Sequence, residues 1–204
     1  MVVKSCCDSA NRNVKVNRNG QATPLVQKTY ENISDAFVDP AYRLFWAVAW
    51  YTGERPQAIL NLDVGNVYVD AKERKPRDTI IYPCSSRKDK KTREVPVHRN
   101  LSLALAAVYE PPSEGLLFPS PYNSAQPITY QAVDKAFRGA LKEVGLNGKG
   151  YSLYSARRGF ITQLVRRGCD IKVIQRLTGH SSITSLMRYV EVSDEQVRNA
   201  IENF

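Results

Sequence analysis

The segment 41–51 (AYRLFWAVAWY) constrains most strongly how this chain of 204 residues can fold. Its residues are apolar or aromatic on most sides of a helix, which is typical of a helix buried within a domain. Thr52 and Gly53 end this helix, because glycine readily adopts the left-handed conformation that closes a helix. Pro56 suits the first turn of another helix, which is expected to reach about residue 62. Such a helix needs others around it, and the chain is long enough to supply them.

The hydrophobic period changes from helical to alternating after residue 66. Three short apolar runs, over 67–70, 79–82 and 95–97, are separated by basic and turn-forming residues. Apolar runs of this length are typical of short strands. The sequence therefore predicts a small three-stranded antiparallel sheet between helical segments.

Helical spacing dominates the rest of the chain, where glycine, proline and capping residues separate the apolar segments. Helices are expected over 24–38, 100–109, 129–144, 155–167, 170–177, 182–189 and 195–202. Together with the sheet they predict a mostly α protein of the α+β class, with one domain over residues 25–204. Residues 1–24 are polar, and we expect them to form a flexible N-terminal arm.

The chain is basic, with 29 Lys and Arg against 20 Asp and Glu and a net charge of +9. Residues 72–93 concentrate this charge, because nine cations and three anions give the stretch a net charge of +6. The apolar run 79–82 divides the cations into two patches, of which one could simply be solvated. A positive excess of this size favours a polyanionic partner such as nucleic acid.

The composition gives little support to metal or disulfide chemistry. The four cysteines follow no disulfide or metal-binding pattern, and the two histidines, His98 and His180, argue against a structural zinc site. No apolar signal segment follows Met1, and no long uncharged stretch could span a membrane. These features predict an intracellular protein in a reducing compartment, without a metal and without membrane association.

Three residues near the end of the chain, Arg157, His180 and Tyr189, are suited to cutting a phosphodiester bond. This bond resists attack because its charged oxygens repel nucleophiles and its alkoxide is a poor leaving group. An enzyme without a metal ion therefore needs cations around the phosphate, a nucleophile and a proton donor. The guanidinium of arginine grips two oxygens and keeps its charge, and a tyrosine can attack and carry the phosphate covalently.

Five motifs between about residues 24 and 204 resemble, in the right order, those of the tyrosine recombinase or phage integrase family. They are a first arginine motif (52–55, TGER), a β-hairpin with a lysine before a Val-Pro strand (87–96, RKDKKTREVP), a His-x-x-Arg box (154–157, YSAR), a Leu-Gly-His-Ser box (178–182, TGHSS) and a nucleophile segment (187–189, MRY). Any one of these would be weak, whereas five in order are specific. The resemblance implies the catalytic-domain fold of the family and the activity of a site-specific DNA recombinase or integrase.

The resemblance also implies a role for each matched residue. Arg55 and Arg157 would hold the non-bridging oxygens of the scissile phosphate, and His180 would hydrogen-bond the same phosphate. Tyr189 would attack and leave a 3′-phosphotyrosine and a free 5′-hydroxyl, while Lys88 would protonate the departing oxygen. Because the covalent link keeps the bond energy, the reaction would need no metal, no ATP and no other cofactor.

Tyr154 stands where the family has the first histidine of its His-x-x-Arg box, and it could donate a hydrogen bond to the phosphate. A phenol titrates near ~10, so it cannot act as a base at neutral pH as imidazole can. Lys90 and Lys91 are rivals of Lys88 for the role of proton donor. Further DNA contacts are expected from Arg87, Lys90, Lys91, Arg93 and Arg158.

Each candidate also has an ordinary structural explanation. Arg55 could form a surface ion pair, His180 could be a loop or cap residue, and Tyr189 could be a half-buried packing residue. Ala58 stands where the family commonly has a glutamate, so a supporting contact is expected to be looser. Too few residues precede the match for the helical core-binding domain of integrases, and no separate domain of that kind is expected.

The segment after Tyr189 carries an apolar stripe at helical spacing, formed by Val197, Ala200, Ile201 and Phe204. It either packs on its own domain or, as in the family, docks onto a neighbouring subunit of a tetramer on double-stranded DNA, with the free protein a monomer. The resemblance implies a protein of the cytoplasm that is associated with the nucleoid, or one encoded by a virus or other mobile element that acts in the host cell.

Two other functions stay open on the sequence. A type IB topoisomerase uses a similar set of arginine, lysine, histidine and tyrosine, although the hairpin-to-box layout and the short length favour a recombinase. The chain could instead be a catalytically silent DNA-binding protein on the integrase fold, with Tyr154 as the sign of lost chemistry.

Overall fold

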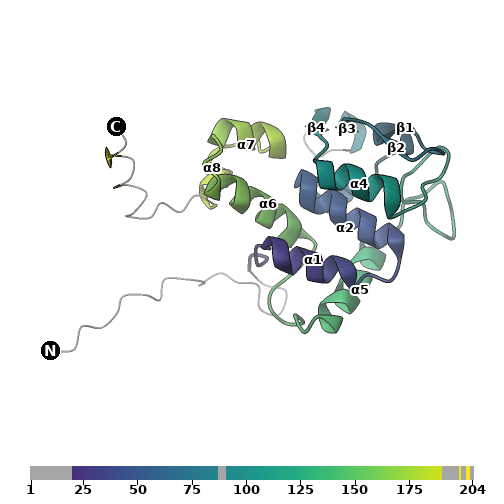
Figure 1. Cartoon of the computed structure of the whole chain (residues 1–204), viewed down its shortest axis with the longest axis horizontal. Coiled ribbons are helices and arrows are strands. Elements are labelled where there is room, and N and C mark those ends of the chain that lie inside the picture. The colour runs from purple at the N-terminus through teal and green to yellow at the C-terminus, as the bar shows by residue number, and fades with distance from the viewer. Residues whose placement is uncertain (1–19, 87–90, 190–197, 199–200, 203–204) are drawn as a thin grey trace.

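The computed structural model describes residues 20–86, 91–189, 198 and 201–202. Most of the expected N-terminal arm (1–24) and of the last helix (195–202) lies outside these residues. The described part is mostly helical, with small antiparallel sheets at one side of the domain (Figure 1). The class predicted from the sequence is therefore confirmed.

Helix α2 (Pro40–Thr52) is the centre of the domain, in agreement with its aromatic sequence. Asp39 caps its start by accepting a hydrogen bond from the Ala41 N–H at 2.8 Å, and Pro40 fills the first turn, where a missing N–H costs nothing. Gly53 ends the helix with a φ of 59°, the left-handed conformation that glycine tolerates best.

The other helices lie close to the ranges expected from the sequence. They are α1 (Gln27–Asp35), α3 (Pro56–Leu60), α4 (Arg99–Ala107), α5 (Tyr130–Glu143), α6 (Tyr154–Arg166), α7 (Ile171–Thr178) and α8 (Thr184–Met187), with short 3-10 turns η1 (Val64–Asn66) and η2 (Cys84–Ser86). Helices α1, α3, α4, α5 and α6 pack around α2 and form one large apolar core. In the part of the chain that the structure describes, no helix is long and apolar enough to cross a membrane.

The strands form two separate pairs, where a single three-stranded sheet was expected. β1 (Tyr68–Asp70) pairs with β2 (Lys75–Pro76), and β3 (Thr79–Tyr82) pairs with β4 (Arg93–Pro96), both antiparallel. Strand β2 was not expected, because a strand of two residues has no visible alternation. Each strand pairs with its neighbour in the chain, and β1 and β3 therefore belong to different sheets.

Close packing of α6 against α2 depends on Gly159. A Cβ atom at this position would lie 2.6 Å from the Leu25 carbonyl oxygen and 2.6 Å from the Trp50 ring. The backbone of α6 can therefore approach both groups only because no side chain intervenes. This approach sets the position of Arg157, which lies two residues earlier on the same helix.

A second and much smaller apolar core is formed by helices α6, α7 and α8. Ile161 on α6, Ile174 on α7 and Leu186 on α8 are fully buried in it. Helix α6 contributes to the packing around α2 and also contacts α7, so it joins α7 and α8 to the rest of the domain (Figure 1).

Candidate active site

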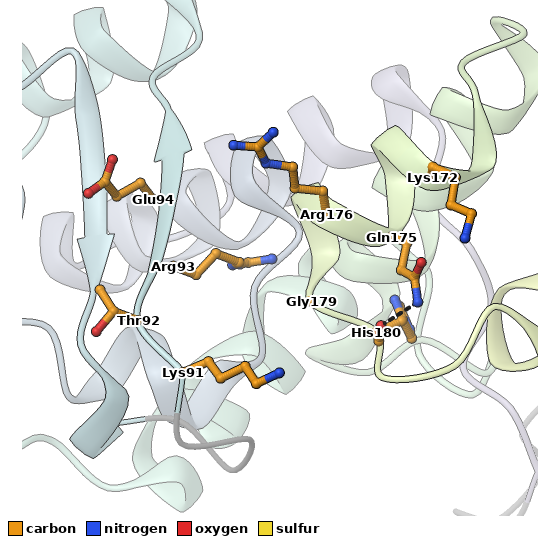
Figure 2. Close-up of a pocket in the computed structure, with 9 residues that line it drawn as sticks. All are labelled: Lys91, Thr92, Arg93, Glu94, Lys172, Gln175, Arg176, Gly179 and His180. Carbon is orange, nitrogen blue, oxygen red and sulfur yellow. Dashed lines mark hydrogen bonds between the residues drawn. The ribbon is translucent and has the colours of Figure 1, made fainter.

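A cleft of about 610 Å³ lies between the β3–β4 hairpin and helix α7 (Figure 2). Lys91 and Arg93 line it from the hairpin, while Lys172 and Arg176 line it from the helix, and His180 follows at the end of α7. Lys172 and Arg176 are exposed, and neither forms an ion pair with another described residue. A concave surface with so many cations attracts anions.

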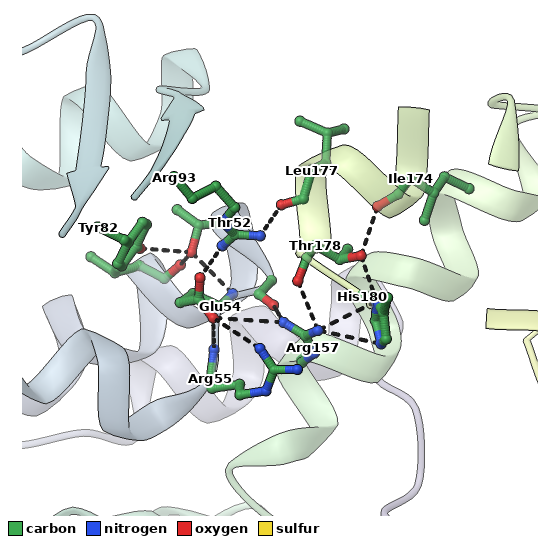
Figure 3. A network of polar contacts seen from close by, with 12 residues as sticks. Thr52, Glu54, Arg55, Tyr82, Arg93, Arg157, Ile174, Leu177, Thr178 and His180 are labelled. Atoms are coloured by element: carbon green, nitrogen blue, oxygen red, sulfur yellow. Dashed lines mark hydrogen bonds and ion pairs between the residues drawn. The ribbon is translucent and has the colours of Figure 1, made fainter. Parts of the chain in front are cut away.

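A buried carboxylate, that of Glu54, organises the arginines beside this cleft (Figure 3). Glu54 comes directly after the glycine that ends α2, and its side chain is fully buried. One carboxylate oxygen accepts a hydrogen bond from the Arg55 N–H at 2.7 Å, and the other accepts one from Arg93. The guanidinium of Arg157 lies 3.8 Å away. Burial of this carboxylate is tolerable because cations surround it.

Arg157 is buried on α6 and connects three parts of the chain. Its Nη1 donates to the Gly53 carbonyl at 2.7 Å, and its Nη2 donates to the Thr178 carbonyl at 2.9 Å. Burial and then the charge of Arg55 lower the pKa of Arg157 to about 10, while Glu54 acts in the opposite direction. The guanidinium therefore stays charged at neutral pH and is held in one place, as a phosphate-binding group requires.

Arg55 lies just before α3, and its side chain is 35% exposed. Figure 3 shows its guanidinium beside that of Arg157. The two positive groups repel each other, as the lowered pKa of Arg157 indicates. An anion bound between them would relieve that repulsion, so the pair is suited to a phosphate.

His180 turns its ring towards the same guanidinium. Nη2 of Arg157 lies 3.4 Å from Nδ1 and 3.3 Å from Nε2, and the Thr178 hydroxyl lies 2.6 Å from Nδ1. Burial lowers the pKa of His180, and nearby arginines lower it further, to about 4, so the ring is neutral at pH 7. In decreasing order of effect these arginines are Arg157, Arg55, Arg188 and Arg93.

Tyr189 is half-buried and lies two residues after the end of α8, at the edge of the smaller core. The centre of the Arg158 guanidinium lies 5.6 Å from the centroid of its ring. The phenol also acts electrostatically on Arg157, whose pKa it raises. The candidate nucleophile is thus a neighbour of the candidate phosphate clamp.

Two arginines that were expected to contact DNA are held by protein groups. Arg93 is buried and donates to Glu54 and to a carbonyl on α7. Arg158 is half-buried, donates to the Ala22 carbonyl and lies over the ring of Tyr189. The structure gives both of them supporting contacts within the site, and a DNA contact by either stays a prediction.

Tyr154 is the first residue of α6 and is 44% exposed. It acts electrostatically on Tyr130 of α5, and no hydrogen bond joins it to Arg55, Arg157 or His180, all of which the structure describes. The structure therefore shows no hydrogen bond that would tie Tyr154 to the arginine cluster, and its contact with a phosphate stays a prediction. Three other candidates, Arg87, Lys88 and Lys90, lie outside the described residues.

Several residues of the site were not predicted from the sequence. Glu54 could have been predicted. Ala58 stands where the family commonly has a glutamate, and a buried arginine cluster needs a carboxylate from another residue. Lys172 and Arg176 lie four residues apart and therefore on one face of α7, which is a weaker signal. Thr178 departs from the leucine of the family's Leu-Gly-His-Ser box, but the sequence did not show that its hydroxyl would lie between Ile174 and His180.

The site is built for an anion. Among the described residues, no group of three or more His, Cys, Asp or Glu side chains is placed to hold a metal ion. Guanidinium groups from three distant parts of the sequence meet instead around Glu54 (Figure 3). Fixed positive charge of this kind stabilises the extra negative charge of a phosphate under attack.

The sequence model of the phage integrase family matches residues 24–196, which is most of the chain. The chain belongs to this family. Among similar proteins, tyrosine recombinase XerA of Pyrococcus horikoshii is 39% identical over 61 residues, which cover 30% of this chain and 20% of the relative. A putative integrase of Pseudomonas phage Pf1 is 32% identical over 114 residues, which cover 56% of this chain and 30% of the relative. The matches thus span less than a third of these relatives.

Solved structures of integrase-family proteins share the fold. The catalytic domain of bacteriophage HP1 integrase matches with a TM-score of 0.65 and 20% identity, covering 89% of this chain and 95% of that domain. XerH recombinase bound to its difH substrate matches with a TM-score of 0.68 and 19% identity, covering 91% of this chain and 55% of that chain. The described fold is that of a tyrosine recombinase catalytic domain.

Proposed function

We propose that the chain is a tyrosine-type DNA recombinase or integrase that cleaves and rejoins DNA strands through a 3′-phosphotyrosine. The convergence of Arg55 and Arg157 beside Tyr189 supports this proposal most strongly. Arg55 lies between α2 and α3, Arg157 lies on α6 and Tyr189 follows α8. An ordinary ion pair would not require side chains from all three of these segments.

In the proposed reaction, the two guanidinium groups bind the non-bridging oxygens of the scissile phosphate. The Tyr189 hydroxyl loses its proton as its oxygen attacks phosphorus and forms the phosphotyrosine bond, and the expelled 5′-oxygen takes up a proton, so that the step is balanced. Lys88 is the proposed proton donor, with Lys90 and Lys91 as rivals. A 5′-hydroxyl from another strand then attacks the phosphotyrosine, restores the phosphodiester and returns the proton to the tyrosine.

The basic cleft is the proposed path of the DNA backbone away from the scissile phosphate. Lys172 and Arg176 are exposed on one wall, and Lys91 is exposed on the other. XerH and the Tn1549 integrase, which share the fold, were solved in complexes with DNA. Contacts with double-stranded DNA by this chain would depend on salt, because they release counterions from the phosphates.

Assembly and location are parts of the same proposal. The apolar stripe after Tyr189 would dock onto a neighbouring subunit of a tetramer on DNA, while the free chain would be a monomer. The similarity to integrases of phages and to transposases of transposons supports a protein that acts on DNA for a mobile element inside a host cell.

The test is covalent trapping on nicked suicide substrates drawn from a library of DNA sequences. The wild-type chain should form a protein–DNA adduct that resists denaturation, and Tyr189→Phe should form none, because it lacks the nucleophilic oxygen. Tyr122→Phe is the matched control, since Tyr122 is 97% exposed and lies far along the chain from the site. A specific gel shift without an adduct would make the chain a silent DNA-binding protein. Relaxation of supercoils without site preference would make it a topoisomerase.

A further inference from the structure

Thr178 has two partners that together decide where the proton of His180 lies. It is buried at the end of α7, where the Leu-Gly-His-Ser pattern of the family has leucine. Its hydroxyl oxygen lies 2.6 Å from the Ile174 carbonyl oxygen and 2.6 Å from Nδ1 of His180 (Figure 3). A leucine would make neither hydrogen bond.

The donor in each of these contacts follows from the chemistry of the groups. A carbonyl oxygen only accepts hydrogen bonds, so the single hydroxyl proton of Thr178 must go to Ile174. The same hydroxyl oxygen can then only accept from His180, which places a proton on Nδ1. In a neutral imidazole the other nitrogen, Nε2, is left as an acceptor.

We infer that Thr178 is a positioning residue that holds neutral His180 as the Nδ1–H tautomer and presents Nε2 to the site as an acceptor. Nη2 of Arg157 lies at similar distances from both ring nitrogens, 3.3 Å from Nε2 and 3.4 Å from Nδ1, and with the proton on Nδ1 only Nε2 can accept from it. The Thr178 carbonyl accepts a second proton from the same Nη2 at 2.9 Å. One residue thus orients the phosphate clamp directly through its backbone and indirectly through the imidazole.

The surroundings of His180 favour this neutral tautomer. The charged groups that act on it from every neighbouring element are positive: Arg157 on α6, Arg55 before α3, Arg93 on β4 and Arg188 after α8. A second proton on the ring would add a like charge to this group, whereas a lone pair at Nε2 is stabilised by it.

A consequence for the reaction rests on the proposed function. The family resemblance implied that His180 hydrogen-bonds the phosphate, whereas a neutral His180 with its proton on Nδ1 has no proton on Nε2 to donate to a phosphate oxygen. A bound phosphate would offset the surrounding positive charge, and Nε2 would then be the atom at which His180 takes up a proton. That proton would come from solvent, and only after its uptake could Nε2 donate a hydrogen bond to a phosphate oxygen.

The two histidines of the chain make this inference directly measurable. The Nδ1 atom of His98 accepts a hydrogen bond from the Asn100 N–H at 3.1 Å, so His98 must carry its proton on Nε2. Long-range proton–nitrogen correlation NMR of the ¹⁵N-labelled chain at pH 7 should therefore show two opposite tautomers. Assignment by His98→Asn identifies the signals of His180. An Nε2–H tautomer at His180 would overturn the inference.

Variants of Thr178 distinguish a role of its hydroxyl in positioning His180 from a purely structural role. Thr178→Val keeps the shape and removes the hydroxyl, so the signals of His180 should move away from a pure Nδ1–H tautomer, and adduct formation should slow about tenfold. Thr178→Ser keeps the hydroxyl and should restore both the tautomer and the rate. Thr162→Val, the same exchange at a half-buried position on α6, should change neither readout.

The NMR readout keeps this inference independent of the proposed function, because it needs neither DNA nor activity. A chain that forms no adduct but shows the expected tautomers refutes the function alone. An unchanged tautomer in a folded Thr178→Val variant refutes the role of the hydroxyl, whether or not the chain cleaves DNA.

Discussion

The core around α2 and the smaller core beneath α6, α7 and α8 differ in what they contribute. The first is large and apolar, with both tryptophans of the chain, Trp46 and Trp50, buried on α2. The second has three fully buried residues, and most of its other members are half-buried. Yet the second region carries His180 and Tyr189. The larger apolar core thus lies in one region and the proposed nucleophile in the other.

Charged and polar groups connect the two regions across the site. Glu54 and Arg93 belong to the side of α2 and the hairpin, and Arg157 links them through the Thr178 carbonyl to α7. A polar connection needs specific geometry, because each buried charge must find its partner. The site therefore depends on the relative placement of the two regions more than on either alone.

The largest change in stability is expected when Glu54, the negative charge in the network that connects the two regions, is neutralised. Glu54→Gln would leave Arg93 and Arg157 without a buried counterion, and we expect a loss of about 4 kcal/mol in the free energy of unfolding. Urea denaturation measures this loss. Asp35→Asn is the control, because Asp35 pairs with Arg43 on the surface, and its loss should cost less than about 1 kcal/mol. Equal effects of the two changes would show that the network adds no more than a surface ion pair.

A pair of leucine truncations compares the two cores themselves. Leu44 and Leu186 are both fully buried, one in each core. Leu44→Ala should lower the unfolding midpoint seen by tryptophan fluorescence, with a cost of about 3 kcal/mol.

Leu186→Ala should instead abolish adduct formation at temperatures where tryptophan fluorescence is still native, because local opening of α7 and α8 leaves the core around α2 intact. A thermal scan that records both signals on each variant makes the comparison. If both signals disappear together in Leu186→Ala, the two regions unfold as one unit.

The smallest effect is a pH dependence that belongs to His180. The pKa of His180 is about 4 in the folded chain against an ordinary 6.5. Between these two pH values the imidazole is therefore more fully protonated in the unfolded chain than in the folded one. Stability should therefore fall as the pH drops from 6.5 to 4, by about 2 kcal/mol once solvent screening is allowed for, and this contribution should be constant above 6.5.

Denaturation of the wild-type chain and of His180→Asn across this range measures the difference. The variant should lack this contribution, so its stability should fall less between pH 6.5 and pH 4. The parallel variant His98→Asn should keep the full dependence. Parallel curves for the wild-type chain and His180→Asn would refute the buried, positively charged environment of this imidazole.

Much of the helical architecture could be predicted from the sequence, because local chemistry specifies it. Thr129 caps α5 as expected, by accepting a hydrogen bond from the Ala132 N–H, and Gly53 closes α2. The two-residue strand β2 could not be predicted, because pairing with β1 creates it and its own side chains do not.

The candidate site, too, could be predicted only in part. The order and spacing of the five motifs depend on residue types alone, and they were enough to identify the family. The roles of Arg55, Arg157, His180 and Tyr189 stay predictions. The sequence did not indicate that Arg93 would pair with Glu54, or that Tyr154 would be 44% exposed.

By itself, the sequence determined the kind of chemistry, because a guanidinium, an imidazole and a phenol have their properties wherever they lie. The tertiary structure decided which groups are buried, which charges face one another and which nitrogen of His180 carries the proton. Those properties depend on distances of a few ångströms between residues far apart in the chain, and only the packed fold sets such distances.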